Sequence, residues 1–143
     1  MKQYVAGFLF DNDRQNVVLI RKNRPEYQAG KLNAVGGKFE PIDHTVFLSM
    51  EREFFEEAGV NVAGWDNFCV LRNEILSYEV YFFRTFNTTA FNAARTMESE
   101  AIVKLRVKDV IVRPDTMPNL CWLIPMALDT SVRHAAVIDQ GTH

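Results

Sequence analysis

The stretch REFFEEAG, Arg52 to Gly59, holds three glutamates beside two phenylalanines and ends on glycine. On a helix, Glu53, Glu56 and Glu57 fall on one face, because residues three and four positions apart are neighbours. Three like charges so close repel one another unless a cation lies among them. Arg52 can offset one charge but not three. The stretch therefore indicates either a divalent-ion site or an acidic face turned to water.

The sequence around this stretch predicts a helix over Val46–Ala58. Asp43 or Thr45 can cap its N-terminus, and Gly59 is typical of a helix C-terminus. A second face of the helix is apolar, which predicts packing on a sheet. Its members are Phe47, Met50, Phe54 and Ala58.

Outward from the helix, short β-rich runs alternate with turn residues. Two runs joined by DNDRQ predict a hairpin, and the segments Arg21–Lys31 and Asn87–Thr96 read as loops. The expected strands are Tyr4–Phe10, Val17–Ile20, Leu32–Val35, Phe68–Arg72, Tyr78–Phe86 and Ala101–Val107. A last helix is expected over Leu120–Val132, with Pro125 tolerable only in its first turn. This order predicts an α+β fold with helices on a mixed sheet.

Composition narrows the function classes. The 143 residues fit a single domain, 1–143, and 48% hydrophobic with 24% charged residues is typical of a globular protein in water. A net charge of −2 argues against a long nucleic acid as partner. No apolar run approaches the roughly 18 residues that cross a bilayer, and the N-terminus does not resemble a signal peptide. Cys69 and Cys121 form no metal-ligand cluster, so we expect a cytoplasmic protein with reduced thiols. The oligomeric state stays open.

The segment GGKFEPIDHTVFLSMEREFFEEAGV, Gly36–Val60, resembles the Nudix box, the signature of the Nudix hydrolase family. The second half of that signature is matched in full. The first half departs from it: counted from the second glycine, the family's glutamate falls on Asp43, and eight residues rather than seven separate it from Arg52. Counting back from Arg52 puts His44 at that position instead, so the loop carries one extra residue.

The resemblance implies an α/β/α sandwich around a mixed sheet and hydrolysis of a nucleoside diphosphate linked to a further group. It implies that Glu53, Glu56 and Glu57 bind Mg²⁺, or Mn²⁺, with Glu53 or Glu56 also able to act as the base. The backbone carbonyl of Gly37 would help to hold the metal ion, and Arg52 would orient the glutamates.

Two further groups of charged residues are candidate site residues. The family often adds an acid from a loop across the site, and MESEAIV offers Glu98 and Glu100; either one can equally be a surface acid. Arg21, Lys22 and Arg24 follow the second strand and could contact phosphates, although such clusters are commonly solvated surface charge.

The segments GKLNAVGGK and MPNLCWLIP resemble parts of the MutT and oxidised-purine triphosphatase branch. By that resemblance Asn33 and Asn119 would meet the edge of a base, because an amide both donates and accepts hydrogen bonds. Trp122, Phe8 and Leu120 could flank the ring. Asn119 can alternatively cap the last helix, and Trp122 can lie in the core. Oxidised-purine triphosphatases of one type carry acids where this chain has Asn119 and Leu120, and this difference weakens any transfer of their base preference.

These expectations combine into a Mg²⁺-dependent hydrolase that cleaves a nucleoside triphosphate, with a modified or oxidised dNTP as one option, to a monophosphate and pyrophosphate. Two alternatives stay open. One is another substrate of the same class: ADP-ribose, a dinucleoside polyphosphate or an RNA cap. The other is a Nudix-fold module that binds a nucleotide without cleaving it, although such a module would be expected to lack some of the three glutamates present here.

Overall fold

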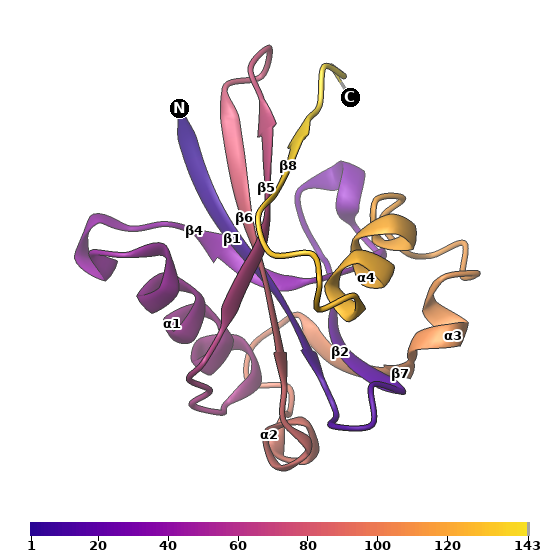
Figure 1. The fold of residues 1–143 in the computed structure, drawn as a ribbon. Helices are drawn as coiled ribbons and strands as arrows, with labels where there is room; N and C mark the ends of the chain where they lie inside the picture. The colour runs from indigo at the N-terminus through magenta and orange to yellow at the C-terminus, as the bar shows by residue number, and fades with distance from the viewer. Residues whose placement is uncertain (143) are drawn as a thin grey trace.

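A computed structural model describes residues 1–142 as a mixed sheet flanked by helices on both faces (Figure 1). The strands are β1 (Lys2–Phe10), β2 (Asn16–Arg21), β3 (Leu32–Asn33), β4 (Val35–Lys38), β5 (Asp66–Asn73), β6 (Tyr78–Phe86), β7 (Ala101–Arg106) and β8 (Ala135–Ile138). The helices are α1 (Val46–Ala58), α2 (Thr88–Ala93), α3 (Val107–Val110) and α4 (Leu120–Leu128), with 3₁₀ turns at Glu26–Gln28 and Pro41–Asp43. The predicted α+β class with a mixed sheet is confirmed.

The sheet is organised around β1. Its strand order is β3-β2-β1-β6-β5-β8, with β4 added to β1 and β7 added to β2. One edge of β1 pairs in parallel with β6 along its whole length. The other edge is shared, since Tyr4 to Gly7 pair with β4 and Leu9 and Phe10 pair with β2. This sharing brings the glycine pair of β4 beside the first half of β1.

Alternation along the strands produces two cores, one on each face. On the first face, α1 packs through buried side chains of Met50, Phe54 and Ala58. On the second face, α4 packs through buried Leu123, Ile124 and related residues, and Val110 of α3 joins this core. Figure 1 shows α1 on one side of the sheet and α3 and α4 on the other. This arrangement is the α/β/α sandwich that the resemblance implied.

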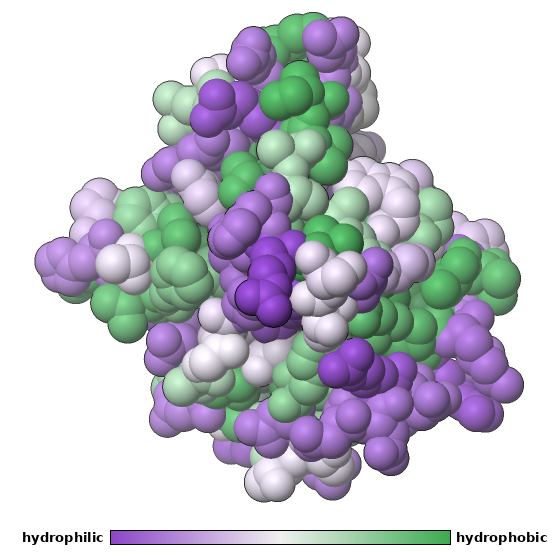
Figure 2. Space-filling view, in the orientation of Figure 1, coloured by the Kyte–Doolittle hydropathy of each residue, from purple (hydrophilic) through white to green (hydrophobic). Residues whose placement is uncertain are grey.

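The apolar face of α1 differs from the prediction at one residue. Met50, Phe54 and Ala58 are fully buried as expected, but Phe47 remains 48% exposed and makes an edge contact with Phe83 of β6, with ring centroids 5.3 Å apart. Phe47 therefore lies at the margin of the packed face of α1, while Val46 in the same turn packs against the core. Figure 2 shows hydrophobic surface gathered over this end of α1, at the left of the view.

Several elements were wrong or missed in the sequence. Helix α3 was not expected, and the single strand expected over Leu32–Val35 is divided into β3 and β4. The predicted loop over residues 87–96 contains α2, which Asn87 caps by accepting a hydrogen bond from the backbone N–H of Ala90 at 3.0 Å. The last helix ends at Leu128 rather than Val132, and Pro125 is its sixth residue rather than a first-turn residue. Burial of one helix face against the sheet offsets the cost of that proline. The four residues of β8 were too few to recognise by alternation.

Candidate active site

The ends of α1 follow from local sequence. Thr45 caps the N-terminus, since its hydroxyl accepts a hydrogen bond from the backbone N–H of Leu48 at 3.1 Å. Gly59 ends the helix in the left-handed conformation, with φ of 74°, which glycine adopts without strain. Of the two predicted caps, Thr45 is therefore the one used. Asp43 has another role.

Asp43 is buried and binds the guanidinium of Arg52. Arg52 donates from Nε to Oδ1 at 2.6 Å and from Nη2 to Oδ2 at 2.9 Å. The Arg52 guanidinium holds the pKa of Asp43 down to about 2, and the carboxylate in turn raises the pKa of Arg52. His44 is exposed, with φ of 64°, so the extra residue of the loop is absorbed in a turn after Asp43. Of the two alternatives left open by the spacing, the structure selects Asp43.

The three glutamates of α1 lie in different environments. The side chain of Glu53 is 12% exposed and that of Glu56 is 44% exposed, and Arg52 Nη1 lies 3.1 Å from a carboxylate oxygen of each. Glu53 lies against Gly37, where an added Cβ would come within 2.4 Å of the Glu53 carboxylate. Burial raises the pKa of Glu53, and the neighbouring Arg52 only partly offsets this effect. A glycine at position 37 is thus required for Glu53 to occupy its place.

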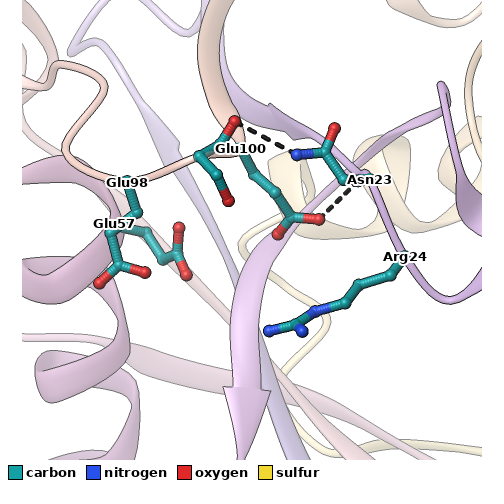
Figure 3. Close-up of a pocket in the computed structure, with 6 residues that line it drawn as sticks. Asn23, Arg24, Glu57, Glu98 and Glu100 are labelled. Carbon is teal, nitrogen blue, oxygen red and sulfur yellow. Dashed lines mark hydrogen bonds between the residues drawn. The ribbon is translucent and has the colours of Figure 1, made fainter.

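Glu57 faces a separate cluster of acids. One of its oxygens, Oε2, is buried and has no hydrogen-bond partner within residues 1–142. Burial, followed by the charges of Glu98 and Glu100, raises the pKa of Glu57 to about 7. Figure 3 shows Glu57 beside Glu98 at the wall of a cavity of about 310 Å³, also lined by Asn23, Arg24, Ser99 and Glu100.

The two acids of the 97–100 loop are not equivalent. Glu100 accepts hydrogen bonds from Lys22 Nζ at 3.0 Å and from the backbone N–H of Asn23 at 2.6 Å. Burial acts to raise the pKa of Glu100, but these hydrogen bonds outweigh it and leave the pKa below its usual value. Glu98 makes no hydrogen bond or ion pair with any residue from 1 to 142. Glu98 is thus the acid with free oxygens next to Glu57.

The donor set fits a hard divalent cation. All of its donors are oxygens, from carboxylates and one backbone carbonyl, and one carboxylate oxygen is buried without a partner close to other acids, whose like charges repel it. Within residues 1–142 no three such side chains converge into a preformed cage. An open set of this kind suits Mg²⁺, which keeps several waters and is usually bound by few protein ligands together with substrate phosphates. Glu53, Glu56, Glu57 and the carbonyl of Gly37 are the residues that would hold it.

A groove of about 930 Å³ lies on the α4 face of the sheet, and it is connected to the acids through Lys22, which binds Glu100, and Gly37, which lies against Glu53. Asn33, Asn119 and Trp122 line it together, and Lys22 and Gly37 also belong to its walls. The structure thus brings together most of the substrate-binding residues expected from the sequence. Tyrosines 4, 27 and 78 also line the groove and were missed. The sequence carries no signal for them, because the pairing of β1 with β6 brings Tyr4 and Tyr78 to the groove and the 3₁₀ turn of residues 26–28 brings Tyr27.

The candidate base-reading residues differ in their contacts. Asn33 Nδ2 donates to Gln28 Oε1 at 3.0 Å, and Asn33 Oδ1 accepts from the backbone N–H of Ala34. Asn119 stands at the N-cap position of α4, but its side chain makes no capping hydrogen bond, and its Oδ1 is buried without a partner among the described residues. Trp122 is 38% exposed, so it is not a core residue.

Three residues lie apart from the groove. Phe8 and Leu120 are fully buried in the core, so the expectation that they flank a ring is wrong. Arg21 lines neither the groove nor the acid cavity, since its Nη1 donates to the carbonyl of Gly30 at 2.8 Å and to Asp115 Oδ2 at 3.2 Å. Arg21 therefore links the 22–31 segment to the segment before α4.

Among the helices of residues 1–142, none has the length and apolar character that a membrane-spanning helix needs.

Comparison with known proteins places these features in a family. The chain superposes on a MutT structure from a study of Aliivibrio salmonicida and Vibrio cholerae, with a TM-score of 0.60, 20% sequence identity and 92% of each chain covered. It superposes on MutT from Bacillus halodurans with a TM-score of 0.73 and 17% identity, over 98% of this chain and 91% of the other. It also superposes on the NUDIX domain of Shewanella oneidensis NrtR, solved with ADP ribose, with a TM-score of 0.76 and 17% identity, over 90% of this chain and 87% of the other. A comparison with curated proteins finds no match. A model of the NUDIX domain family matches residues 1–119, which is most of the chain. The chain therefore belongs to the NUDIX family, and the predicted class, a Nudix pyrophosphohydrolase, is confirmed.

Proposed function

We propose that the protein hydrolyses a nucleoside triphosphate to a nucleoside monophosphate and pyrophosphate with the help of Mg²⁺, which Mn²⁺ could replace. The observation that carries this proposal is the buried, unpartnered Oε2 of Glu57, which lies among acids beside a nucleotide-sized groove. A lone carboxylate oxygen in this position is costly unless a cation binds it. Glu53, Glu56, Glu57 and the Gly37 carbonyl would supply the protein ligands.

The bound ion would neutralise phosphate charge and favour attack by water on phosphorus. The protein's own residues would position the carboxylates and accept the proton of the attacking water. Arg52, fixed by Asp43, holds Glu53 and Glu56 in place through contacts at 3.1 Å. Glu53, whose pKa burial raises, suits proton acceptance from water, and Glu98 offers a further acid with free oxygens. Positioning and charge stabilisation would thus account for most of the rate.

The groove suits a base with both donors and acceptors on its edge. Asn119 presents an unpartnered buried oxygen, and Asn33 lies in the same groove. Trp122, at 38% exposed, offers a ring face for stacking. These residues suit recognition of a nucleobase, and a modified or oxidised dNTP is one candidate substrate. Such an activity would clean the cytoplasmic nucleotide pool.

A second candidate substrate is ADP-ribose or another nucleoside diphosphate linked to a second group. The groove, at about 930 Å³, is large enough for more than a base and sugar, and the NrtR NUDIX domain of similar fold was solved with ADP ribose. The aromatic residues Tyr4, Tyr27 and Tyr78 line the same groove as Trp122 and could bind a second ring.

A substrate panel tests these proposals. Purine and pyrimidine triphosphates, 8-oxo-dGTP, ADP-ribose and a diadenosine polyphosphate would be incubated with Mg²⁺, and the products separated by ion-exchange chromatography. The proposal expects pyrophosphate and a monophosphate from a triphosphate. Preferential cleavage of ADP-ribose to AMP and ribose phosphate would favour the second candidate. Nucleotide binding with no cleavage of any compound would favour a non-catalytic module.

A further inference from the structure

The chain leaves β2 through a run of basic residues whose side chains take different partners. Arg21 is bound to Asp115 at 3.2 Å, and Lys22 is bound to Glu100 at 3.0 Å. Arg24 makes no side-chain hydrogen bond or ion pair with any residue from 1 to 142. Of the three cations that the sequence placed near a phosphate, Arg24 is therefore the one whose donors stay available in the described structure.

The position of Arg24 is fixed by its neighbour. The backbone N–H of Asn23 donates to Glu100 Oε2 at 2.6 Å, and Asn23 Nδ2 donates to the carbonyl of Ser99 at 3.2 Å (Figure 3). These two hydrogen bonds tie the segment that carries Arg24 to the loop that carries Glu98. Arg24 and Glu98 consequently line the same cavity.

We propose that Arg24 binds the distal phosphates of the substrate, the pair that leaves as pyrophosphate. This inference rests on the proposed function. Lys22 lines the groove that holds Asn33 and Asn119, whereas Arg24, two residues later, lines the acid cavity. A nucleoside in the groove directs its phosphate chain past Lys22 toward the cavity, so the end of that chain reaches Arg24.

The chemistry of the side chain fits that partner. A guanidinium presents a planar fork of N–H donors that matches two phosphate oxygens. Arg24 lines a cavity shared with Glu57 and Glu98 but forms an ion pair with neither. A divalent ion held by the carboxylates would occupy their oxygens and leave an incoming phosphate as the partner of Arg24.

Isothermal titration calorimetry on the full chain tests the proposal, with inorganic pyrophosphate and, separately, AMP or GMP as ligands in the presence of Mg²⁺. Arg24→Ala is expected to weaken pyrophosphate binding by about 10- to 100-fold, as for a lost hydrogen bond to a charged group. Monophosphate binding should change by less than about twofold, because the nucleoside and its first phosphate do not reach Arg24. Arg24→Lys should bind pyrophosphate with an affinity between those of the unmodified chain and Arg24→Ala, since lysine keeps the charge but lacks the planar fork of N–H donors.

Arg133→Ala is the matched control, because Arg133 is also exposed and lines neither the groove nor the cavity. It should bind both ligands as the unmodified chain does. Unchanged pyrophosphate binding in Arg24→Ala, or an equal loss for both ligands, would overturn the proposal. Pyrophosphate binding through Arg24 in a protein that cleaves no triphosphate would support the role of Arg24 and refute the proposed reaction, so the two failures are distinguishable.

Discussion

Arg52 and Asp43, nine residues apart in the sequence, form a two-point ion pair with distances of 2.6 and 2.9 Å. Asp43 belongs to the turn before α1 and Arg52 to its middle, so the pair fixes the turn against the helix. The same guanidinium also contacts Glu53 and Glu56. One side chain thus links the loop that departs from the family pattern to two of the proposed metal ligands.

Asp43→Asn should destabilise the protein by about 1.5–3 kcal/mol, because the Arg52 guanidinium loses a charged hydrogen-bond partner. Chemical denaturation measures this change. The pKa of Asp43 is lowered from 3.8 to about 2, so the stabilisation is complete above pH 3.8 and is lost as the pH falls through about 2. The variant should therefore lose less stability than the unmodified chain below about pH 4. Identical acid profiles for both proteins would contradict this role for Asp43.

Gly37→Ala should displace Glu53, because the added Cβ would lie within 2.4 Å of its carboxylate carbon. We expect affinity for Mn²⁺ to fall by about 10- to 100-fold, in the range seen when support of a metal ligand is lost. Gly30→Ala is a control for backbone strain, since Gly30 has φ of 80° and no atom within 4 Å of an added Cβ. Equal metal affinity in the two variants would show that the contact with Glu53 has no role.

The stability of the metal-free protein should depend on the ionisation of Glu57. Its pKa is raised from 4.5 to about 7, so the folded chain holds a proton that the unfolded chain releases. The associated stability is complete below pH 4.5 and is lost as the pH rises through about 7. Thermal denaturation with EDTA at about pH 5 and about pH 8 should show a larger fall in Tm for the unmodified chain than for Glu57→Gln. Parallel behaviour of the two proteins would rule out this assignment.

The substitution Asn119→Leu tests whether Asn119 contributes to nucleotide binding rather than to the stability of the fold. Asn119 Oδ1 is buried without a partner in the described structure, so its removal should leave stability unchanged or raise it by up to about 1 kcal/mol. Nucleotide affinity should fall, and the ratio of kcat/KM between purine triphosphates should move toward one. Melting curves and competition kinetics measure the two effects. A strongly destabilised variant would mean that Asn119 has a structural role at the start of α4.

The sequence predicted the elements whose pattern is local. Val46–Ala58 was placed with its observed bounds because capping, apolar spacing and a terminal glycine agree over thirteen residues. The β1–β2 and β5–β6 hairpins followed from turn residues between β-branched runs. By contrast, β8 is stabilised by pairing with β5, more than sixty residues away, and its sequence alone carries little alternation.

The same distinction holds for the site. The face shared by Glu53, Glu56 and Glu57 is a property of helical spacing, so it could be predicted. The different roles of Arg21, Lys22 and Arg24 could not be predicted. They depend on Asp115, which binds Arg21, and Glu100, which binds Lys22, and both acids lie more than seventy residues away in the sequence. The exposure of Phe47 likewise could not be predicted, because helical spacing places Phe47 on the same face as Met50 and Phe54, which are buried.

The central claim is that the α1 acids hold a divalent ion, and Mn²⁺ binding followed by electron paramagnetic resonance tests it most directly. Glu53→Gln and Glu57→Gln should each weaken Mn²⁺ binding by about tenfold or more, while Glu51→Gln, on the same helix but outside the cavity and the groove, should not. Mn²⁺ binding that is equally strong in all four proteins would contradict the account.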